Sequence, residues 1–174
     1  MNDLTKLANT LNAGLVRRWH TKHKLSQNVA EHSFGAAVIA IYLLLKNNTP
    51  AEFNLGVVLG SLLHDAPELF TGDIPAPVRD KLENLSAFAE IEADARNKVF
   101  TMHALSQTQA NIIFYADKLE AALFAIKHDA LDIAEFNFDA IKKRMATDTF
   151  TPPEIKERVQ KFFAVPFEAE RHRQ

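Results

Sequence analysis

Apolar side chains recur every three or four residues along most of this chain, which is the spacing that gathers them on one face of an α-helix. The pattern predicts helices over residues 3–16, 28–46, 49–65, 77–82, 86–104, 106–128, 131–145 and 151–163. Only 5 Gly and 7 Pro are present, too few for the many turns of an all-β fold. We therefore expect an all-α helical bundle, with residues 1–174 forming a single domain.

Several helix starts carry a capping signal, in which a side-chain acceptor precedes Glu or Gln by three residues. The pairs are Asn28 with Glu31, Thr49 with Glu52, and Ser106 with Gln109. Asp3 is the expected N-cap of the first helix. Gly56 and Gly60 stand inside the third helix, where glycine is unfavourable, and predict that another helix backbone approaches there. In the helix over 86–104 the residues expected to face inward are Leu85, Phe88, Ile91, Ala95, Val99 and Met102.

Composition removes several classes of function. The chain has no cysteine, so any metal ion must be held by histidines and carboxylates. The formal net charge of −2, with a single local basic cluster at residues 17–24 around the lone tryptophan, argues against binding to nucleic acid polymers or to membrane surfaces. No signal peptide and no apolar run of 18 residues is found. The expected location is the cytoplasm, or the host cytoplasm if the chain is phage-encoded.

The densest group of polar chemistry is at residues 61–75, directly after an apolar helical run. His64 and Asp65 are adjacent, and Pro67 ends the helix because it lacks an N–H and would clash with the preceding turn. Both side chains are therefore expected in a last turn that opens into a cavity, with Glu68 facing it as an acid or base and the Thr71 hydroxyl close by. The alternative is a buried His64 bonded to a carbonyl, with Asp65 and Glu68 as solvent-exposed charges.

Two further residues complete a candidate metal site. His32 and Asp117 lie in other predicted helices, and an aspartate within an apolar segment is costly to bury unless it is paired or bound to a cation. His32, His64, Asp65 and Asp117 would give two imidazoles and two carboxylates, which suit Zn²⁺, Co²⁺, Mn²⁺ or Fe²⁺. The alternative for Asp117 is a half-exposed carboxylate paired near Lys118 or with another helix.

These residues form an H…HD…D pattern. In this pattern the chain resembles the HD-domain phosphohydrolases. A fuller set of motifs is similar to the 5′-deoxynucleotidase branch, and to the phage dATP phosphohydrolases within it: Arg18-Trp19, Glu31-His32-Ser33, His64-Asp65-Ala66-Pro67-Glu68, Thr71-Gly72-Asp73-Ile74-Pro75 and Asp117. The resemblance implies a helical fold of the HD type. It also implies metal-dependent removal of 5′-phosphates, from mono- to triphosphate, with dATP or dAMP preferred and deoxyadenosine released.

The resemblance further implies a role for each matched residue. His32, His64, Asp65 and Asp117 would bind the ion. Glu68 would orient or deprotonate the nucleophile, or hold a second cation with Asp73. Arg18 would bind the 5′-phosphate, Trp19 would pack on the sugar and exclude a 2′-hydroxyl, and Asp73 would accept from the 3′-hydroxyl. The wall against the base would be Ile74, Pro75, Ala76 and Pro77, with Arg79 near the phosphates and Thr21 near the purine edge. The alternatives are Arg18 as a helix-end cation and Trp19 as ordinary core.

One position departs from the family. Phe114 stands three residues before Asp117, where relatives often carry a lysine that meets phosphate, which puts the preference for triphosphates in doubt. Lys22, Lys24, Arg79 and Lys118 are the candidates to supply that charge. The remaining histidines are expected to be surface or packing residues: His20, His23, His103, His128 and His172.

Two other functions stay open: a 5′-deoxynucleotidase acting on any deoxynucleoside monophosphate, or an HD-type hydrolase of another nucleotide phosphoester. A non-catalytic metal-binding module is a third reading, which the presence of Glu68 argues against. Helices that are apolar all round, together with related enzymes, suggest a homo-oligomer, either a dimer or a hexamer.

Overall fold

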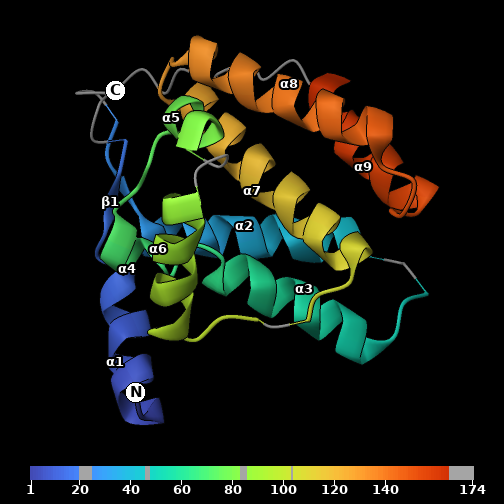
Figure 1. Cartoon of the computed structure of the whole chain (residues 1–174). Coiled ribbons are helices and arrows are strands. Elements are labelled where there is room, and N and C mark those ends of the chain that lie inside the picture. Colours follow the sequence, from blue (N-terminus) through green and yellow to red (C-terminus); the bar gives the residue numbers. More distant parts are fainter. Residues whose placement is uncertain (20–24, 46–47, 83–85, 103, 165–174) are drawn as a thin grey trace, which may run out of the picture. The chain divides into compact units, whose positions relative to one another are not determined.

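The computed structural model describes residues 1–19, 25–45, 48–82, 86–102 and 104–164 (Figure 1). In chain order the elements are α1 (Asp3–Ala13), β1 (Arg17–Arg18), β2 (Gln27–Asn28), α2 (Val29–Leu44), α3 (Ala51–Leu63), α4 (Glu68–Thr71), α5 (Ala76–Leu82), α6 (Ser86–Asn97), α7 (Gln107–Lys127), α8 (Leu131–Thr147) and α9 (Pro153–Ala164). The all-α prediction is confirmed. Among the described helices, none is both long and apolar enough to cross a bilayer.

The chain folds into two compact units, which are described separately. Residues 1–34 and 62–103 make the first unit, and residues 35–61 and 104–174 make the second. The peptide chain passes from one unit to the other three times: within α2, within α3 and between α6 and α7. The single domain over residues 1–174 stays a prediction.

The first unit contains α1, the β1–β2 hairpin, α4, α5 and α6. α1 packs beside α4, and α4 packs beside α6 (Figure 1). The small core of this unit is formed by buried Ala13, Ala66 and Val99, with Leu69 packed against them. The strands are antiparallel, with Arg17 opposite Asn28 and Arg18 opposite Gln27. This hairpin corrects the expectation of a polar loop up to Asn28.

The second unit is organised by α7, which packs along α8. Its main core joins the ends of α2 and α3 to α7, α8 and α9, and the largest fully buried side chains in it are Tyr115, Leu43, Ile112, Leu119, Ile141 and Ile155. A second cluster, with Ala122, Ala125 and Ala134 buried, lies at the other end of the α7–α8 pair. Alanines on both helices permit this close packing.

Helix starts follow the capping signals at two positions. The Asn28 Oδ1 atom accepts from the Glu31 backbone N–H at 2.9 Å, and the Glu31 carboxylate accepts from the Asn28 N–H at 3.0 Å. Ser106 and Gln109 form the same reciprocal pair at the start of α7. At α1 the prediction was wrong by one residue. The cap is Asn2, whose side chain accepts from the Thr5 N–H at 2.8 Å. Asp3 therefore lies in the first turn of the helix.

Thr49 does not close the expected box with Glu52. Its hydroxyl instead donates to the Asn54 side chain at 2.6 Å, and α3 begins at Ala51. The prediction for residues 86–104 was too long, since α6 ends at Asn97. Ile91 on that helix is 55% exposed rather than inward, whereas Phe88, Ala95 and Val99 are buried as expected.

The glycines of α3 make room for side chains, not for another backbone. A Cβ atom at Gly56 would lie 2.5 Å from the Gln109 Nε2 atom, and one at Gly60 would lie 2.3 Å from the Ile113 Cδ1 atom. Both neighbours project from α7. The predicted close approach is therefore present in the second unit, but side chains of α7 occupy the space.

Candidate active site

The turn after α3 places the central pair of residues. α3 ends at Leu63, and the Glu68 N–H then donates to the Asp65 carbonyl at 2.9 Å, which closes a tight turn before α4. Pro67 within this turn has no N–H to continue the α3 ladder. His64 and Asp65 consequently stand where the helix ends, as expected from the proline.

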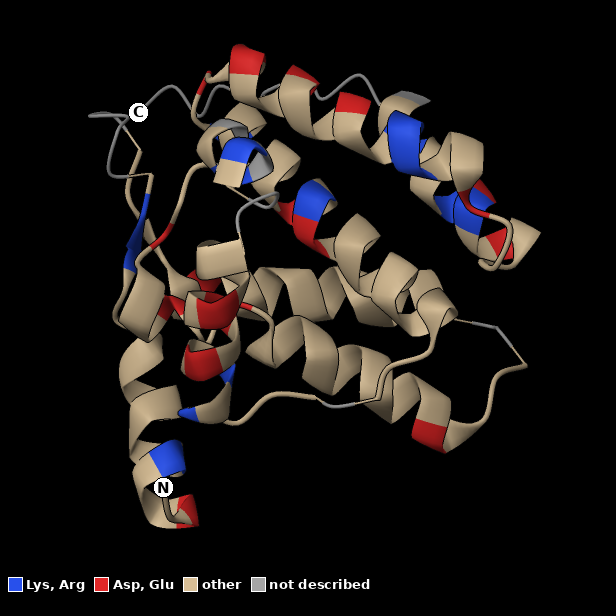
Figure 2. Ribbon diagram, in the orientation of Figure 1, with Lys and Arg blue, Asp and Glu red and all other residues tan. Residues whose placement is uncertain are grey.

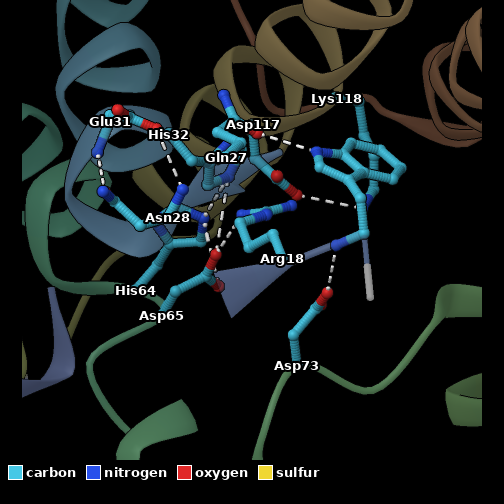
Figure 3. Close-up of polar contacts among 11 residues, drawn as sticks. Arg18, Gln27, Asn28, Glu31, His32, His64, Asp65, Asp73, Asp117 and Lys118 are labelled. Carbon is cyan, nitrogen blue, oxygen red and sulfur yellow. Dashed lines mark hydrogen bonds and ion pairs between the residues drawn. The ribbon is translucent and has the colours of Figure 1, made fainter. Parts of the chain in front are cut away.

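Three side chains of the first unit meet at this turn (Figure 3). The Nε2 atoms of His32 and His64 are 3.3 Å apart. His32 Nε2 is 3.4 Å from Asp65 Oδ2, and His64 Nε2 is 3.3 Å from Asp65 Oδ1. One ligand atom from each residue lies within 4.8 Å of the others, a grouping that could hold a metal ion. His32 is fully buried on α2, so its ring is fixed by the packing around it.

These distances suit a small divalent ion. Zinc ligands at about 2.0–2.1 Å in tetrahedral geometry stand roughly 3.3–3.4 Å from one another. Two imidazole nitrogens that face each other across a gap of this size and share a carboxylate offer lone pairs to one point. The donor set of nitrogen and oxygen, without sulfur, suits zinc, cobalt or manganese.

Arg18 reaches the same turn from β1. Its Nη1 atom lies 2.5 Å from Asp65 Oδ2, and both side chains are 11% exposed (Figure 3). The pairing of Arg18 with Gln27 across the hairpin fixes the backbone from which this arginine extends. A buried guanidinium beside the candidate ligands is well placed to meet an anion, because its planar fork matches two phosphate oxygens.

Glu68 is the buried carboxyl group of the site. It begins α4 and is 7% exposed, and its Oε2 atom is buried with no hydrogen-bond partner among the described residues. Burial raises the pKa of Glu68 to about 9, with the negative charges of Asp65 and Asp73 adding to the shift and Arg18 and His64 opposing it. Such a carboxyl group can hold and transfer a proton near neutral pH.

Asp73 and Trp19 contact each other. Asp73 Oδ2 accepts from the Trp19 backbone N–H at 3.1 Å, and Trp19 has a φ of 60°. The indole Nε1–H of Trp19 donates to Gln27 Oε1 at 2.9 Å. Gln27 was not predicted as a site residue, because a glutamine in a segment expected to be a polar loop carries no signal. The feature that identifies Gln27 is its pairing with Arg18 across the hairpin, and this pairing is visible only in the structure.

Arg79 on α5 is paired with Glu92 on α6, and Arg96 binds the other oxygen of Glu92 at 2.9 Å. Figure 2 shows the acidic positions of α6 that make this pairing possible. Burial would lower the pKa of Arg79, but its hydrogen bond and ion pair with Glu92 raise it, and the charges of Asp65 and Glu68 act in the same direction. Arg79 therefore keeps its full charge within electrostatic reach of the candidate site.

The rest of the predicted base wall follows Asp73. Ile74 and Pro75 are partly buried in the loop before α5, and the backbone of Ala76 and Pro77 belongs to the start of that helix. Thr71 is partly buried at the end of α4, and its hydroxyl donates to the Gly72 carbonyl at 3.1 Å.

Thr21, Lys22 and Lys24 lie outside the described residues, as do His20, His23, His103 and His172. His128, the C-cap of α7, is exposed, and its ring packs 4.4 Å from that of Phe124.

Asp117 belongs to the second unit. It lies on α7 with its side chain 15% exposed, and its Oδ2 atom is 3.0 Å from Lys118 Nζ. Phe114, one turn earlier, has the Arg144 guanidinium 4.7 Å from its ring centre and Lys118 Nζ at 5.8 Å. Arg144 is a cation near this position that sequence reasoning did not consider, because α8 is distant in the chain.

Comparisons with known proteins point in one direction. A 5′-deoxynucleotidase of Vibrio parahaemolyticus is 28% identical over 151 residues, covering 75% of this chain and 77% of that protein. A dATP triphosphohydrolase of Salmonella phage PMBT28 is 38% identical over 93 residues, covering 49% of this chain and 48% of that protein.

A solved structure shares the fold. The HD phosphohydrolase DatZ of cyanophage S-2L, bound to dA and one catalytic Zn²⁺ ion, superposes with a TM-score of 0.70 at 21% identity, covering 90% of this chain and 94% of that one. At this identity the likeness concerns the fold, which is thus of the HD type. The family model described as 5′-deoxynucleotidase YfbR-like matches residues 6–165. The chain belongs to the YfbR-like 5′-deoxynucleotidase family.

Proposed function

We propose that this protein is a metal-dependent phosphohydrolase that removes 5′-phosphates from deoxynucleotides, with dATP or dAMP preferred and deoxyadenosine as a product. Support comes from one arrangement in the first unit: His32, His64 and Asp65 converge at 3.3–3.4 Å beside the buried carboxyl group of Glu68. The names of the relatives supply the class of substrate. A cytoplasmic location belongs to the same proposal, because deoxynucleotides are made and used there.

His32, His64 and Asp65 would hold the ion, with Asp117 as the fourth ligand required by the sequence pattern. A divalent ion supplies Lewis-acid polarisation of a phosphoryl oxygen and acidifies a water molecule. Zinc, cobalt and manganese fit the donor set. Asp73 and Glu68 are the candidates for a second cation.

Glu68 manages the proton in this proposal. A carboxyl group with a pKa near 9 is protonated at neutral pH. A cation beside Glu68 favours its ionised form, which is the form that orients or deprotonates a nucleophile. The buried Oε2 atom of Glu68, which has no partner among the described residues, is available for that hydrogen bond.

Arg18, Arg79 and Trp19 would recognise the substrate. Arg18 is held by Asp65 before substrate arrives, so little of its side-chain freedom remains to be lost on binding a 5′-phosphate. Arg79, oriented by Glu92, would serve the outer phosphates. Trp19 would pack on the sugar and leave no partner for a 2′-hydroxyl, and Asp73 would accept from the 3′-hydroxyl. Ile74, Pro75, Ala76 and Pro77 would form the wall against the base.

A second candidate function is a 5′-deoxynucleotidase restricted to monophosphates, which the aromatic residue at Phe114 favours. Phe114 stands where relatives often carry a lysine. The cations near it are Lys118, which is paired with Asp117, and Arg144, which lies over the Phe114 ring. The product released from dATP separates the two candidates. Triphosphate or pyrophosphate indicates a triphosphate substrate, whereas turnover of dAMP alone indicates the second function.

The test uses purified protein with dAMP, dATP, AMP and dGMP, in the presence of Co²⁺, Zn²⁺ or Mn²⁺ and after chelation. We expect activity on deoxyadenosine nucleotides that chelation abolishes and a divalent ion restores. Glu68→Ala should lower kcat about a hundredfold or more, the scale of general acid–base catalysis. Glu90→Ala, an exposed carboxylate on α6, is the matched control and should retain activity. Absence of any released phosphate product under all three metals would refute the function.

We also infer that the protein is a homo-oligomer, a dimer or a hexamer. α1 contacts the rest of the first unit through buried Ala13 and through two polar side chains: Asn9 donates to the Lys98 carbonyl at 2.8 Å, and Thr10 accepts from the Phe100 N–H at 2.8 Å. The leucines of the same helix point outward, with Leu4 78% and Leu11 70% exposed. An amphipathic helix whose apolar face is left in water is typical of a subunit contact.

A further inference from the structure

Trp19 is held in a backbone conformation that large side chains avoid. Its φ of 60° lies in the left-handed region, where the Cβ atom crowds the following carbonyl. A bulky residue stays in this region only when the surrounding structure fixes it, and such residues occur preferentially at functional sites. The conformation of Trp19 therefore calls for identifiable contacts that hold it.

Two hydrogen bonds hold Trp19 from opposite ends of the residue. Asp73 accepts from its backbone N–H at 3.1 Å, and Gln27 accepts from its indole N–H at 2.9 Å. The indole N–H is the single polar group of a tryptophan side chain, so its acceptor determines how the ring is turned. Asp73 fixes where the ring is attached, and Gln27 fixes its orientation.

Gln27 is itself rigid. It is 4% exposed and lies in β2 directly opposite Arg18, the residue before Trp19. The hairpin therefore joins three groups in a fixed relation: Arg18 pairs with Asp65, Gln27 faces Arg18 across the strands, and the Gln27 amide reaches forward to the Trp19 indole. Burial and the hydrogen bond to Trp19 together hold the Gln27 side chain in one orientation.

We propose that Gln27 is a positioning residue that fixes the orientation of the Trp19 ring and thereby sets the discrimination between deoxyribose and ribose. This inference rests on the proposed function. The ring can exclude a 2′-hydroxyl only if it cannot turn aside, and removing the amide acceptor would remove the hydrogen bond that fixes its orientation. Discrimination then falls while the chemistry at His64 and Glu68 is retained.

The test compares kcat/KM for dAMP and AMP in the wild type, Gln27→Met, Trp19→Phe and the double variant. Methionine keeps the length of glutamine and removes the acceptor, and phenylalanine removes the indole N–H. Gln27→Met should lower the ratio for dAMP over AMP about tenfold, mainly by improving KM for AMP. In the Trp19→Phe background the same change should have no further effect, because the hydrogen bond is already absent. Gln160→Met, an exposed glutamine on α9, is the control and should leave the ratio unchanged.

A second readout does not depend on catalysis. Trp19 is the only tryptophan of the chain, so tryptophan fluorescence reports this ring alone. Gln27→Met should shift its emission and make it easier to quench with acrylamide, whereas Gln160→Met should not. In the wild type the single indole N–H should exchange slowly with solvent in an NMR spectrum, a measurement that needs no variant and remains decisive if Gln27→Met fails to fold.

Several results would overturn the inference. An unchanged sugar ratio in Gln27→Met, an equal loss with and without Trp19, or a rapidly exchanging indole N–H would each show that Gln27 does not act through the ring. A wild type that hydrolyses neither nucleotide would refute the proposed function and the sugar role together, while fluorescence and exchange would still decide whether Gln27 orients Trp19.

Discussion

At the scale of single residues, Asp148 illustrates a carboxylate used for structure. Its Oδ1 atom accepts from the backbone N–H groups of Phe150 at 2.9 Å and Thr151 at 3.0 Å, and its Oδ2 atom accepts from the Tyr115 hydroxyl at 2.6 Å. Tyr115 is fully buried on α7. Burial alone would raise the pKa of Asp148, but the hydrogen bonds from Thr151, Tyr115 and Phe150 outweigh it and hold this pKa well below its ordinary value.

The depressed pKa predicts an acid-sensitive contribution to stability. A carboxyl group whose pKa is lower when folded stabilises the protein fully above its unfolded pKa, about 3.9, and this contribution is lost as the pH falls below that value. Asp148→Asn should lower the free energy of unfolding by about 2 kcal/mol at pH 7, the worth of hydrogen bonds to a charged group. The difference from wild type should shrink as the pH falls below about 4.

Urea denaturation at pH 7, 5, 4 and 3 measures this difference. Asp139→Asn is the matched control, because Asp139 is an exposed carboxylate on α8 paired with Lys142 at 3.2 Å. Exposed pairs of this kind contribute at most about 1 kcal/mol, and the control should show little dependence on pH. If Asp148→Asn lowers the free energy of unfolding equally at pH 7 and pH 3, the stabilisation does not come from hydrogen bonds to the charged carboxylate.

The sequence predicts residues well where their chemistry is unusual for their setting. His64 and Asp65 attract attention because two polar groups interrupt an apolar helix directly before Pro67. Gln27 and Arg144 carry no such signal, since a polar side chain in a presumed loop or on a partly exposed helix is ordinary. Their importance comes from what they contact across β1–β2 and α7–α8, which periodicity does not encode.

At the scale of elements, Gln109 couples two helices of the second unit. Its Oε1 atom accepts from the Ser106 N–H at 2.9 Å and so completes the cap of α7, while its Nε2 atom donates to the Phe53 carbonyl on α3 at 3.1 Å. Gly56, one turn after Phe53, leaves the space in which this side chain lies. One glutamine therefore fixes both where α7 begins and where it meets α3.

Gly56→Ala should consequently destabilise the protein by about 1–2 kcal/mol, although alanine favours a helix by about 1 kcal/mol. The added methyl group would lie 2.5 Å from Gln109 Nε2 and displace that side chain from its hydrogen bonds with Ser106 and Phe53. In a Gln109→Ala background the clash disappears, and the same substitution should stabilise. Thermal or urea unfolding of the four proteins of this double-mutant cycle gives the answer. Destabilisation of equal size in both backgrounds would mean that Gln109 is not the obstacle.

Two helix starts were predictable from the sequence because capping is local. Asn28 with Glu31 and Ser106 with Gln109 satisfy orphan N–H groups within four residues. The same logic was one residue off at Asn2 and too long for α6, where no capping residue marks the end and the chain leaves the helix after Asn97. The β1–β2 hairpin was missed because each strand has two residues, too few for an alternating pattern.

At the scale of the whole molecule, the sequence predicted the helical class and the family, and the single domain over residues 1–174 stays a prediction. The H…HD…D pattern takes its first three members from the first unit and Asp117 from the second. Residue spacing shows which groups share a helix, whereas long-range packing decides which helices form a core. The core of the second unit, whose members extend from Ile39 to Val159, joins residues more than 100 positions apart in the chain.

The last prediction concerns self-association through the exposed leucines of α1. Leu4, Leu7 and Leu11 share one face of this helix and are 44–78% exposed, while Asn9 and Thr10 hold the opposite side to the rest of the first unit. Placing lysines at Leu4 and Leu11 would bury unpaired charges in a subunit contact, a cost of at least about 3 kcal/mol, so association should weaken by about a hundredfold or more.

Size-exclusion chromatography with light scattering over a range of concentrations measures this change. The wild type should elute as a dimer or hexamer, and the Leu4→Lys, Leu11→Lys variant as a smaller species with unchanged helical content. Asn12→Lys, an exposed change on another face of α1, adds charge without touching the leucines and should remain associated. A wild type that is monomeric at every concentration would refute the oligomer, and an oligomer that survives both lysines would place the contact on another surface. The leucines of α1 lie on the face that does not pack against its own unit, so covering them with a second subunit would remove their apolar surface from water and favour association.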